Sequence, residues 1–152
     1  MLVKEIMQTD VATCAPETPL SAVVSAMWER DCGVLPVVDG RGMVVGVITD
    51  RDVAMAACAT PHATARMSAK DAMSHPVFSC AAEANVRTIL ETMAKHHVRR
   101  LPVLNPSGHL QGILSIDDII CAPHRWDGPS TEDIVSALKR VHVRPVIEIG
   151  SE

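Results

Sequence analysis

The chain has 152 residues, of which 47% are hydrophobic and 21% are charged, proportions typical of a folded globular unit. It carries 14 Lys and Arg residues against 18 Asp and Glu residues, for a formal net charge of −4. This balance argues against a dedicated nucleic-acid-binding domain. Aromatic residues make up 2% of the chain, which leaves little to build a stacking platform for single-stranded nucleic acid.

The sequence repeats itself at an interval of 66 residues. Met7 aligns with Met73, and the Leu-Pro-Val triplet that begins at Leu35 aligns with the one at Leu101. Between residues 7–56 and 73–122, 13 of 50 positions are identical, where composition predicts about three or four. The chain therefore contains a duplication, and we expect its two copies to pack on each other.

Each copy predicts the same order of elements. A short extended piece (11–14 and 77–80) precedes an amphipathic helix, whose apolar residues recur at helical spacing from Leu20 and from Val86. Two strands joined by a glycine-containing turn follow, at 34–38 and 43–48 in the first copy and at 101–104 and 110–114 in the second. A second helix ends each copy, at about 51–58 and 117–122. The prediction is a β-α-β-β-α unit, twice, in an α+β fold.

Two segments have no counterpart in the repeat. Residues 60–68 read as a linker. After the second copy, residues 131–133 begin a last helix with an apolar stripe of Ile134, Val135, Leu138 and Val141, and residues 143–149 look extended. We expect one domain at 1–62, a second at 66–124 and a C-terminal extension at 125–152.

The most informative motif is Gly-h-h-[Thr/Ser]-x-x-Asp (h, hydrophobic), where the second strand of each copy meets its second helix. Its members are Gly46, Thr49 and Asp52 in the first copy and Gly112, Ser115 and Asp118 in the second. The glycine lets another backbone or a flat ligand approach the strand. The hydroxyl lies at a helix N-terminus, and a carboxylate suits the two hydroxyls of a ribose. The alternative is a plain helix cap.

With these motifs in place, the sequence resembles a tandem pair of CBS domains, also called a Bateman module. The resemblance rests on the repeat, the Leu-Pro-Val strand, the glycine-containing hairpin and the Gly-h-h-[Thr/Ser]-x-x-Asp ending, and covers about residues 1–122. It implies two repeats about a pseudo-twofold axis with two clefts for adenosine compounds: AMP, ADP, ATP, NAD or S-adenosylmethionine. It also implies a disc-like homodimer. Because two small sheets cannot cover the apolar stripes of two helices in each repeat, we expect helix faces from both repeats at the dimer interface.

The resemblance also implies roles for individual residues. Asp52 and Asp118 are the expected ribose contacts, and Thr49 and Ser115 the hydroxyl contacts. The expected lining of the adenine slots is Val11, Thr13, Leu35 and Pro36 in one copy and Val77, Ser79, Leu101 and Pro102 in the other.

Arginines are the candidates for binding phosphate. Arg99 and Arg100 belong to a basic cluster before the Leu-Pro-Val strand of the second copy, while the matching positions of the first copy are Gly33 and Val34. Arg51 is a third candidate. The alternative is a solvated helix end or a surface ion pair. Since the copies match at the ribose end but differ at the basic end, we expect both clefts to accept adenosine and to differ in their demand for phosphate.

The remaining features favour a binding module over an enzyme. The histidines and the 5 cysteines form no zinc-binding spacing, and no nucleophile motif or phosphate loop is present. Unpaired cysteines and the lack of a long apolar run predict a cytoplasmic protein without a membrane segment. We predict a non-catalytic sensor, homodimeric, that regulates a separate protein. The alternatives are a structural dimerisation module without ligand and a small nucleotide-processing enzyme.

Overall fold

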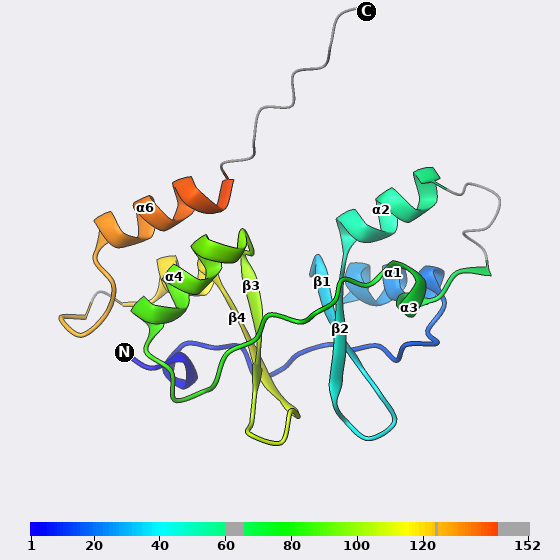
Figure 1. The fold of residues 1–152 in the computed structure, drawn as a ribbon, viewed down its shortest axis with the longest axis horizontal. Helices are drawn as coiled ribbons and strands as arrows, with labels where there is room; N and C mark the ends of the chain where they lie inside the picture. Colours follow the sequence, from blue (N-terminus) through cyan, green and yellow to red (C-terminus); the bar gives the residue numbers. More distant parts are fainter. Residues whose placement is uncertain (60–65, 124, 143–152) are drawn as a thin grey trace, which may run out of the picture.

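The computed structural model describes residues 1–59, 66–123 and 125–142. The predicted linker (60–68) therefore lies mostly, and the predicted extended tail (143–149) entirely, outside the described residues. Figure 1 shows two similar halves side by side, each with a two-stranded antiparallel sheet and helices around it.

The halves contain the predicted elements in the predicted order. The first repeat consists of α1 (Leu20–Glu29), β1 (Val34–Val38), β2 (Val44–Thr49) and α2 (Asp50–Ala59). The second repeat consists of α4 (Val86–His96), β3 (Arg100–Leu104), β4 (Leu110–Ser115) and α5 (Ile116–Cys121). The α+β fold with two related repeats is confirmed.

The extended piece that opens each repeat is shorter than predicted. Only Cys14 pairs with β1, in parallel with Val37, and only Cys80 pairs with β3, in parallel with Val103. In the first repeat this bridge consists of the Cys14 N–H donating to the Pro36 carbonyl at 3.2 Å, and the Val38 N–H donating to the Cys14 carbonyl at 2.8 Å. The predicted strands 11–14 and 77–80 are thus single bridges, because no other residue of either piece pairs with the neighbouring strand.

Two short helices that the sequence did not predict each precede one repeat and pack on the other. The 3-10 helix η1 (Val3–Glu5) precedes the first repeat but buries Val3 in the core of the second. Helix α3 (Ala69–Ala72) precedes the second repeat but buries Ala69 in the core of the first. In Figure 1 the blue N-terminal segment accordingly lies beside β4 and α4, and the green α3 lies beside α1. Each repeat is completed by a segment that precedes the other.

The segment that precedes each repeat also pairs with the second strand of the other repeat. The backbone of Gln8 pairs with Ile113 of β4 through two hydrogen bonds of 2.9 Å. At the equivalent place Ser74 pairs with Val47 of β2, through bonds of 2.8 and 3.2 Å. The repeats are therefore interlocked through main-chain hydrogen bonds as well as apolar contacts.

The motif glycines make this approach possible. A Cβ atom on Gly112 would lie 2.6 Å from the Gln8 carbonyl oxygen and 3.0 Å from the Met7 sulfur. A Cβ atom on Gly46 would meet the Met73 side chain. Of the two explanations offered for these glycines, the structure shows the close approach of another part of the chain.

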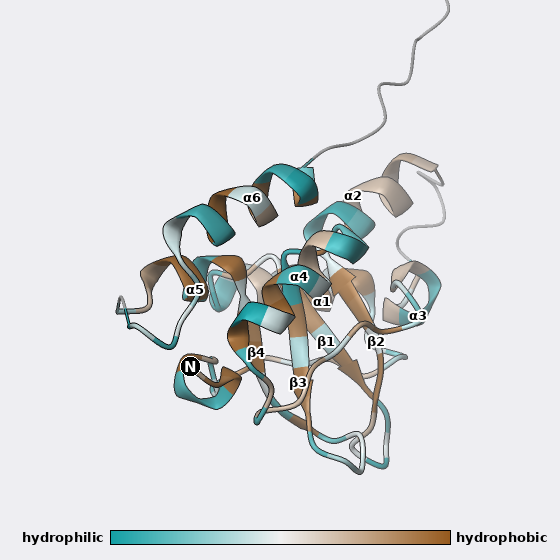
Figure 2. Cartoon of the chain, turned by 60° about the vertical axis from the view of Figure 1, so that its left-hand side comes forward, coloured by the Kyte–Doolittle hydropathy of each residue, from teal (hydrophilic) through white to brown (hydrophobic). Residues whose placement is uncertain are grey.

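Helix α6 (Thr131–His142) folds back over the second repeat and packs along α4 (Figure 1). The predicted apolar stripe is wrong at Val135, which is 44% exposed; Ala137 is fully buried in its place. Helical periodicity explains the difference, since Ala137 lies one turn from Ile134 and from Val141, while Val135 lies off that line. Figure 2 shows the result: hydrophobic strands inside, and alternating hydrophobic and hydrophilic residues along α6. In the described part of the chain, no helix is long and apolar enough to cross a membrane.

Candidate functional site

Two clefts lie between the repeats, and each is built from both. The Asp52 cleft, of about 400 Å³, is lined by the β2–α2 junction of the first repeat and by the segment before α4 and the α4–β3 junction of the second. The Asp118 cleft, of about 740 Å³, is lined by the β4–α5 junction of the second repeat and by the segment before α1 and the α1–β1 junction of the first. The two clefts are equivalent positions of the duplication.

The predicted hydroxyl and carboxylate lie at the end of each cleft and cap a helix. The Thr49 N–H and Oγ–H donate to Asp52 Oδ2 at 2.9 and 2.7 Å, and the Asp52 N–H donates back to Thr49 Oγ1 at 3.2 Å. The Ser115 N–H and Oγ–H donate to Asp118 Oδ2 at 2.7 and 2.6 Å. These are reciprocal capping boxes. Each aspartate can cap its helix and also face the cleft, because capping occupies only one of its two carboxylate oxygens.

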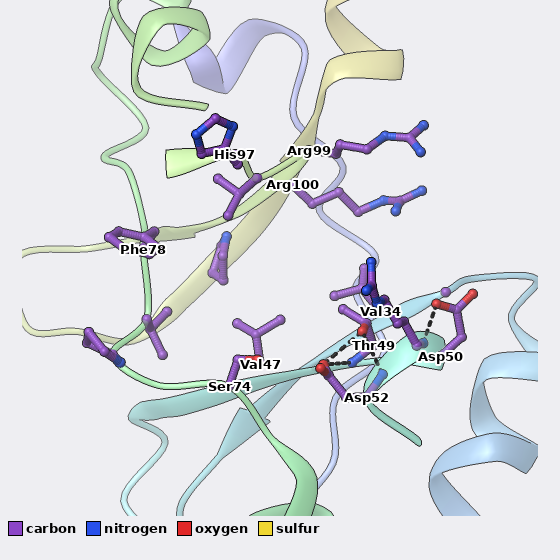
Figure 3. Close-up of a pocket in the computed structure, with 16 residues that line it drawn as sticks. Val34, Val47, Thr49, Asp50, Asp52, Ser74, Phe78, His97, Arg99 and Arg100 are labelled. Carbon is purple, nitrogen blue, oxygen red and sulfur yellow. Dashed lines mark hydrogen bonds between the residues drawn. The ribbon is translucent and has the colours of Figure 1, made fainter. Parts of the chain in front are cut away.

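Apolar side chains form the wall of the Asp52 cleft next to this end. Val47, Val77 and Pro102 contribute to it, together with Phe78 (Figure 3). The Phe78 ring stacks on the His96 ring with 4.1 Å between centroids. Phe78 was missed as a site residue, although it is the only phenylalanine of the chain. Ala12 lies at the matching place of the Asp118 cleft, so among the residues that the structure describes, aromatic lining is confined to the Asp52 cleft.

The predicted adenine-slot residues divide into three groups. Val77 and Pro102 line the Asp52 cleft, and Val11 lines the Asp118 cleft. Leu35 and Leu101 are fully buried in the cores of the two repeats. The third group does not line either cleft, as far as the described residues show, and consists of Thr13, Pro36 and Ser79. Leu101 is buried while its neighbour Pro102 lines a cleft, because successive side chains of a strand point to opposite faces of the sheet.

The three candidate arginines gather at the Asp52 cleft. Arg99 and Arg100 come from the second repeat, across the cleft from Thr49 and Asp52, while Arg51 comes from α2 (Figure 3). Arg100 also borders the Asp118 cleft. The guanidinium groups of Arg99 and Arg100 lie 3.9 and 3.8 Å from Asp117 oxygens, and these side chains are between 38% and 58% exposed. Such long, solvated ion pairs are weak, so the arginines retain donors for a ligand.

Of the described cysteines, Cys32 lines the Asp118 cleft, whereas Cys14 and Cys80 line neither cleft. Cys14 and Cys80 are buried, and desolvation raises the pKa of each thiol to about 11. Both are therefore protonated near neutral pH and are poor nucleophiles. Within residues 1–59, 66–123 and 125–142, no three His, Cys, Asp or Glu side chains are grouped so that they could hold a metal ion.

A family model for the CBS domain matches residues 3–58 and 69–125, one match for each repeat. The chain belongs to the CBS-domain family. CBS domain-containing protein YhcV of Bacillus subtilis is 31% identical over 117 residues, which cover 77% of this chain and 81% of that protein. Inosine-5'-monophosphate dehydrogenase of Thermoplasma acidophilum is 30% identical over 115 residues, but the match covers only 22% of that enzyme.

The fold comparison agrees with the sequence comparison. The CBS domain pair of protein MJ0100, solved in complex with 5'-methylthioadenosine and S-adenosyl-L-methionine, superposes with a TM-score of 0.72 at 24% identity. The match covers 79% of this chain and 93% of that one. The predicted tandem CBS pair is thereby confirmed.

Proposed function

We propose that this CBS pair is a non-catalytic sensor, which binds an adenosine-type ligand between its repeats and regulates a separate protein. The Asp52 cleft carries this proposal. Its carboxylate and hydroxyl suit a ribose, its apolar wall with Phe78 suits a flat base, and its arginines suit a phosphate. Candidate ligands are AMP, ADP, ATP, NAD and S-adenosylmethionine.

The relatives support the ligand class and the regulatory role. The ligands of the MJ0100 pair are both adenosine compounds. The match to the dehydrogenase covers a segment of a much longer enzyme, as expected for a regulatory module attached to catalytic machinery. The 5 free cysteines fit a reducing compartment, and the proposal places the protein in the cytoplasm.

The architecture supplies a route from binding to response. Since each cleft takes its walls from both repeats, a ligand contacts both and favours the packing in which those contacts are best. A ligand that binds one packing more tightly than another shifts the population toward it. The regulated partner responds to that shift because it binds the surface of the module, which differs between the two packings.

The proposal includes a homodimer, and it narrows the expected interface from the helix faces of both repeats to those of the first repeat. On α1, Val24 and Trp28 are 47% and 86% exposed, whereas their equivalents on α4, Leu90 and Ala94, are 1% and 2% exposed. In the second repeat, α6 shares their hydrophobic cluster and covers this face. A second copy would cover the face of the first repeat, where Met55 of α2 is also exposed.

Thermal unfolding with added ligands tests the sensor function. We expect at least one of AMP, ATP, NAD and S-adenosylmethionine to raise Tm, since a ligand at 100 times its Kd adds about 2.7 kcal/mol. No shift with any of them at millimolar concentration favours the structural dimerisation module. Chemical change of the nucleotide on incubation with the protein favours the enzyme.

Trp28→Glu tests the homodimer. Placing a charge at the centre of the apolar face should weaken association by about 2 kcal/mol, or thirtyfold, and light scattering at micromolar concentration should report a monomer. Trp126→Glu is the matched control, because Trp126 is 96% exposed and lies outside α1 and α2. A wild-type monomer, or equal effects of the two substitutions, contradicts the proposed interface.

A further inference from the structure

The two clefts differ at the second oxygen of their carboxylates. In the Asp118 cleft, the Gln8 side-chain amide donates to Asp118 Oδ1 at 2.9 Å. The residue equivalent to Gln8 is Ser74. Among the described residues, none donates a hydrogen bond to Asp52 Oδ1. Capping already uses Oδ2 in both clefts. Of the two capping aspartates, therefore, only Asp52 has a carboxylate oxygen, Oδ1, that accepts no hydrogen bond from the described residues.

The side chain alone causes this difference. The backbones of Gln8 and Ser74 make the same pair of hydrogen bonds to β4 and β2, so the two side chains start from equivalent places. The Gln8 amide reaches the Asp118 carboxylate, whereas the shorter Ser74 side chain lines the Asp52 cleft and makes no hydrogen bond to Asp52 within the described part of the chain. A ribose in the Asp118 cleft has to displace a charge-assisted hydrogen bond that is already made.

The charges around the clefts differ in the same direction. The Asp52 cleft has three arginines against two aspartates: Arg51, Arg99, Arg100, Asp50 and Asp52. The Asp118 cleft has two arginines against four carboxylates: Arg30, Arg100, Asp10, Glu29, Asp31 and Asp118.

One of the two cations of the Asp118 cleft is also engaged, since Arg30 forms a short ion pair with Asp10 at 2.7 Å. In the Asp52 cleft, by contrast, Arg51 makes no ion pair with any of the described residues. A phosphate is thus attracted to one cleft and repelled by the other.

We infer that the Asp52 cleft alone takes a nucleoside phosphate, and that the Gln8 side chain closes the ribose position of the Asp118 cleft. The inference rests on the proposed function, because it assigns the proposed ligand to one of two equivalent clefts. Gln8 is then a specificity-determining residue, and the wild-type chain binds one nucleotide per copy.

Reciprocal substitutions test this inference, with AMP and adenosine as probes in titration calorimetry. Wild type should bind one AMP per chain. Gln8→Ser should add a second site for adenosine but none for AMP, since the carboxylates of that cleft remain. Ser74→Gln should weaken AMP binding about ten- to a hundredfold, because it places the same amide next to Asp52. Thermal unfolding without ligand verifies that both variants fold.

Arg99→Ala tests the charge argument, since Arg99 lines only the Asp52 cleft. It should weaken AMP about ten- to a hundredfold and adenosine much less, with the difference shrinking as salt rises. Arg41→Ala is the control, because it removes the same charge from a side chain that is 88% exposed on the β1–β2 turn.

The outcomes separate the inference from the proposed function. Two equal AMP sites in wild type, or no effect of either substitution at positions 8 and 74, overturns the inference while the sensor function stands. If Gln8→Ser binds adenosine while wild type binds neither probe and none of AMP, ATP, NAD and S-adenosylmethionine raises its Tm, the proposed function fails and the closure by Gln8 stands. If no variant binds either probe, the inference fails, and the thermal unfolding experiment decides the proposed function.

Discussion

The double variant Asp52→Ala, Asp118→Ala should lose detectable binding of both AMP and adenosine while remaining folded. The substitutions remove the carboxylates at the ribose end of both clefts. Loss of hydrogen bonds to a charged group costs about 1.5–3 kcal/mol each, and a ribose diol makes two. Calorimetry against the wild type measures the effect, and unchanged affinity in the double variant contradicts the ribose assignment.

The capping boxes require a control for stability. Asp52 and Asp118 each accept two hydrogen bonds at a helix N-terminus, so each substitution should also lower the free energy of unfolding by about 0.5–2 kcal/mol. Asp71→Ala breaks the same kind of box, in which Asp71 accepts from the Ser68 N–H and Oγ–H. Asp71 lines neither cleft, and its substitution should leave ligand binding unchanged.

The largest loss of stability is expected from Gly112→Ala. The added Cβ would lie 2.6 Å from the Gln8 carbonyl oxygen, and this oxygen cannot move away without breaking its hydrogen bond to the Ile113 N–H. Overpacking of this kind costs about 1–3 kcal/mol. Here it acts where the N-terminal segment pairs with the second repeat, so denaturant unfolding should show a clear drop in midpoint.

Two other glycines serve as controls for this prediction. Gly46→Ala meets the Met73 side chain, which is flexible and can move aside, so the loss should be smaller. Gly40→Ala meets no atom within 4 Å and should change the free energy of unfolding little. Equal effects at all three positions contradict the account of the interlocked repeats.

The duplication made much of the fold predictable. A pattern such as Val86, Ile89, Leu90 and Met93 is strong evidence for a helix when an equivalent pattern occurs at the same place in another copy. The predicted bounds of the hairpin strands and of the second helix in each copy agree with the structure to within one residue, whereas the predicted strands 11–14 and 77–80 are single bridges. The short helices η1 and α3 were missed because three or four residues carry too little periodicity to be recognised.

The site was predictable in part for the same reason. The Thr49–Asp52 and Ser115–Asp118 pairs are local in sequence, and their geometry follows from the start of a helix. Residues that reach a cleft from elsewhere were not predictable. Gln8 contacts Asp118 from 110 positions away, and nothing in the sequence around either residue indicates that contact.

By itself, the sequence determined the repeat, the order of the elements, the CBS family and the chemistry at the end of each cleft. These depend on local periodicity and on motifs a few residues long. Only the tertiary structure decided which arginines lie opposite Asp52, that Gln8 rather than Ser74 engages a carboxylate, and that α6 covers one repeat and leaves Trp28 exposed. Those outcomes depend on how the two copies pack and exchange their leading segments, and local patterns that are the same in both copies carry no information about it.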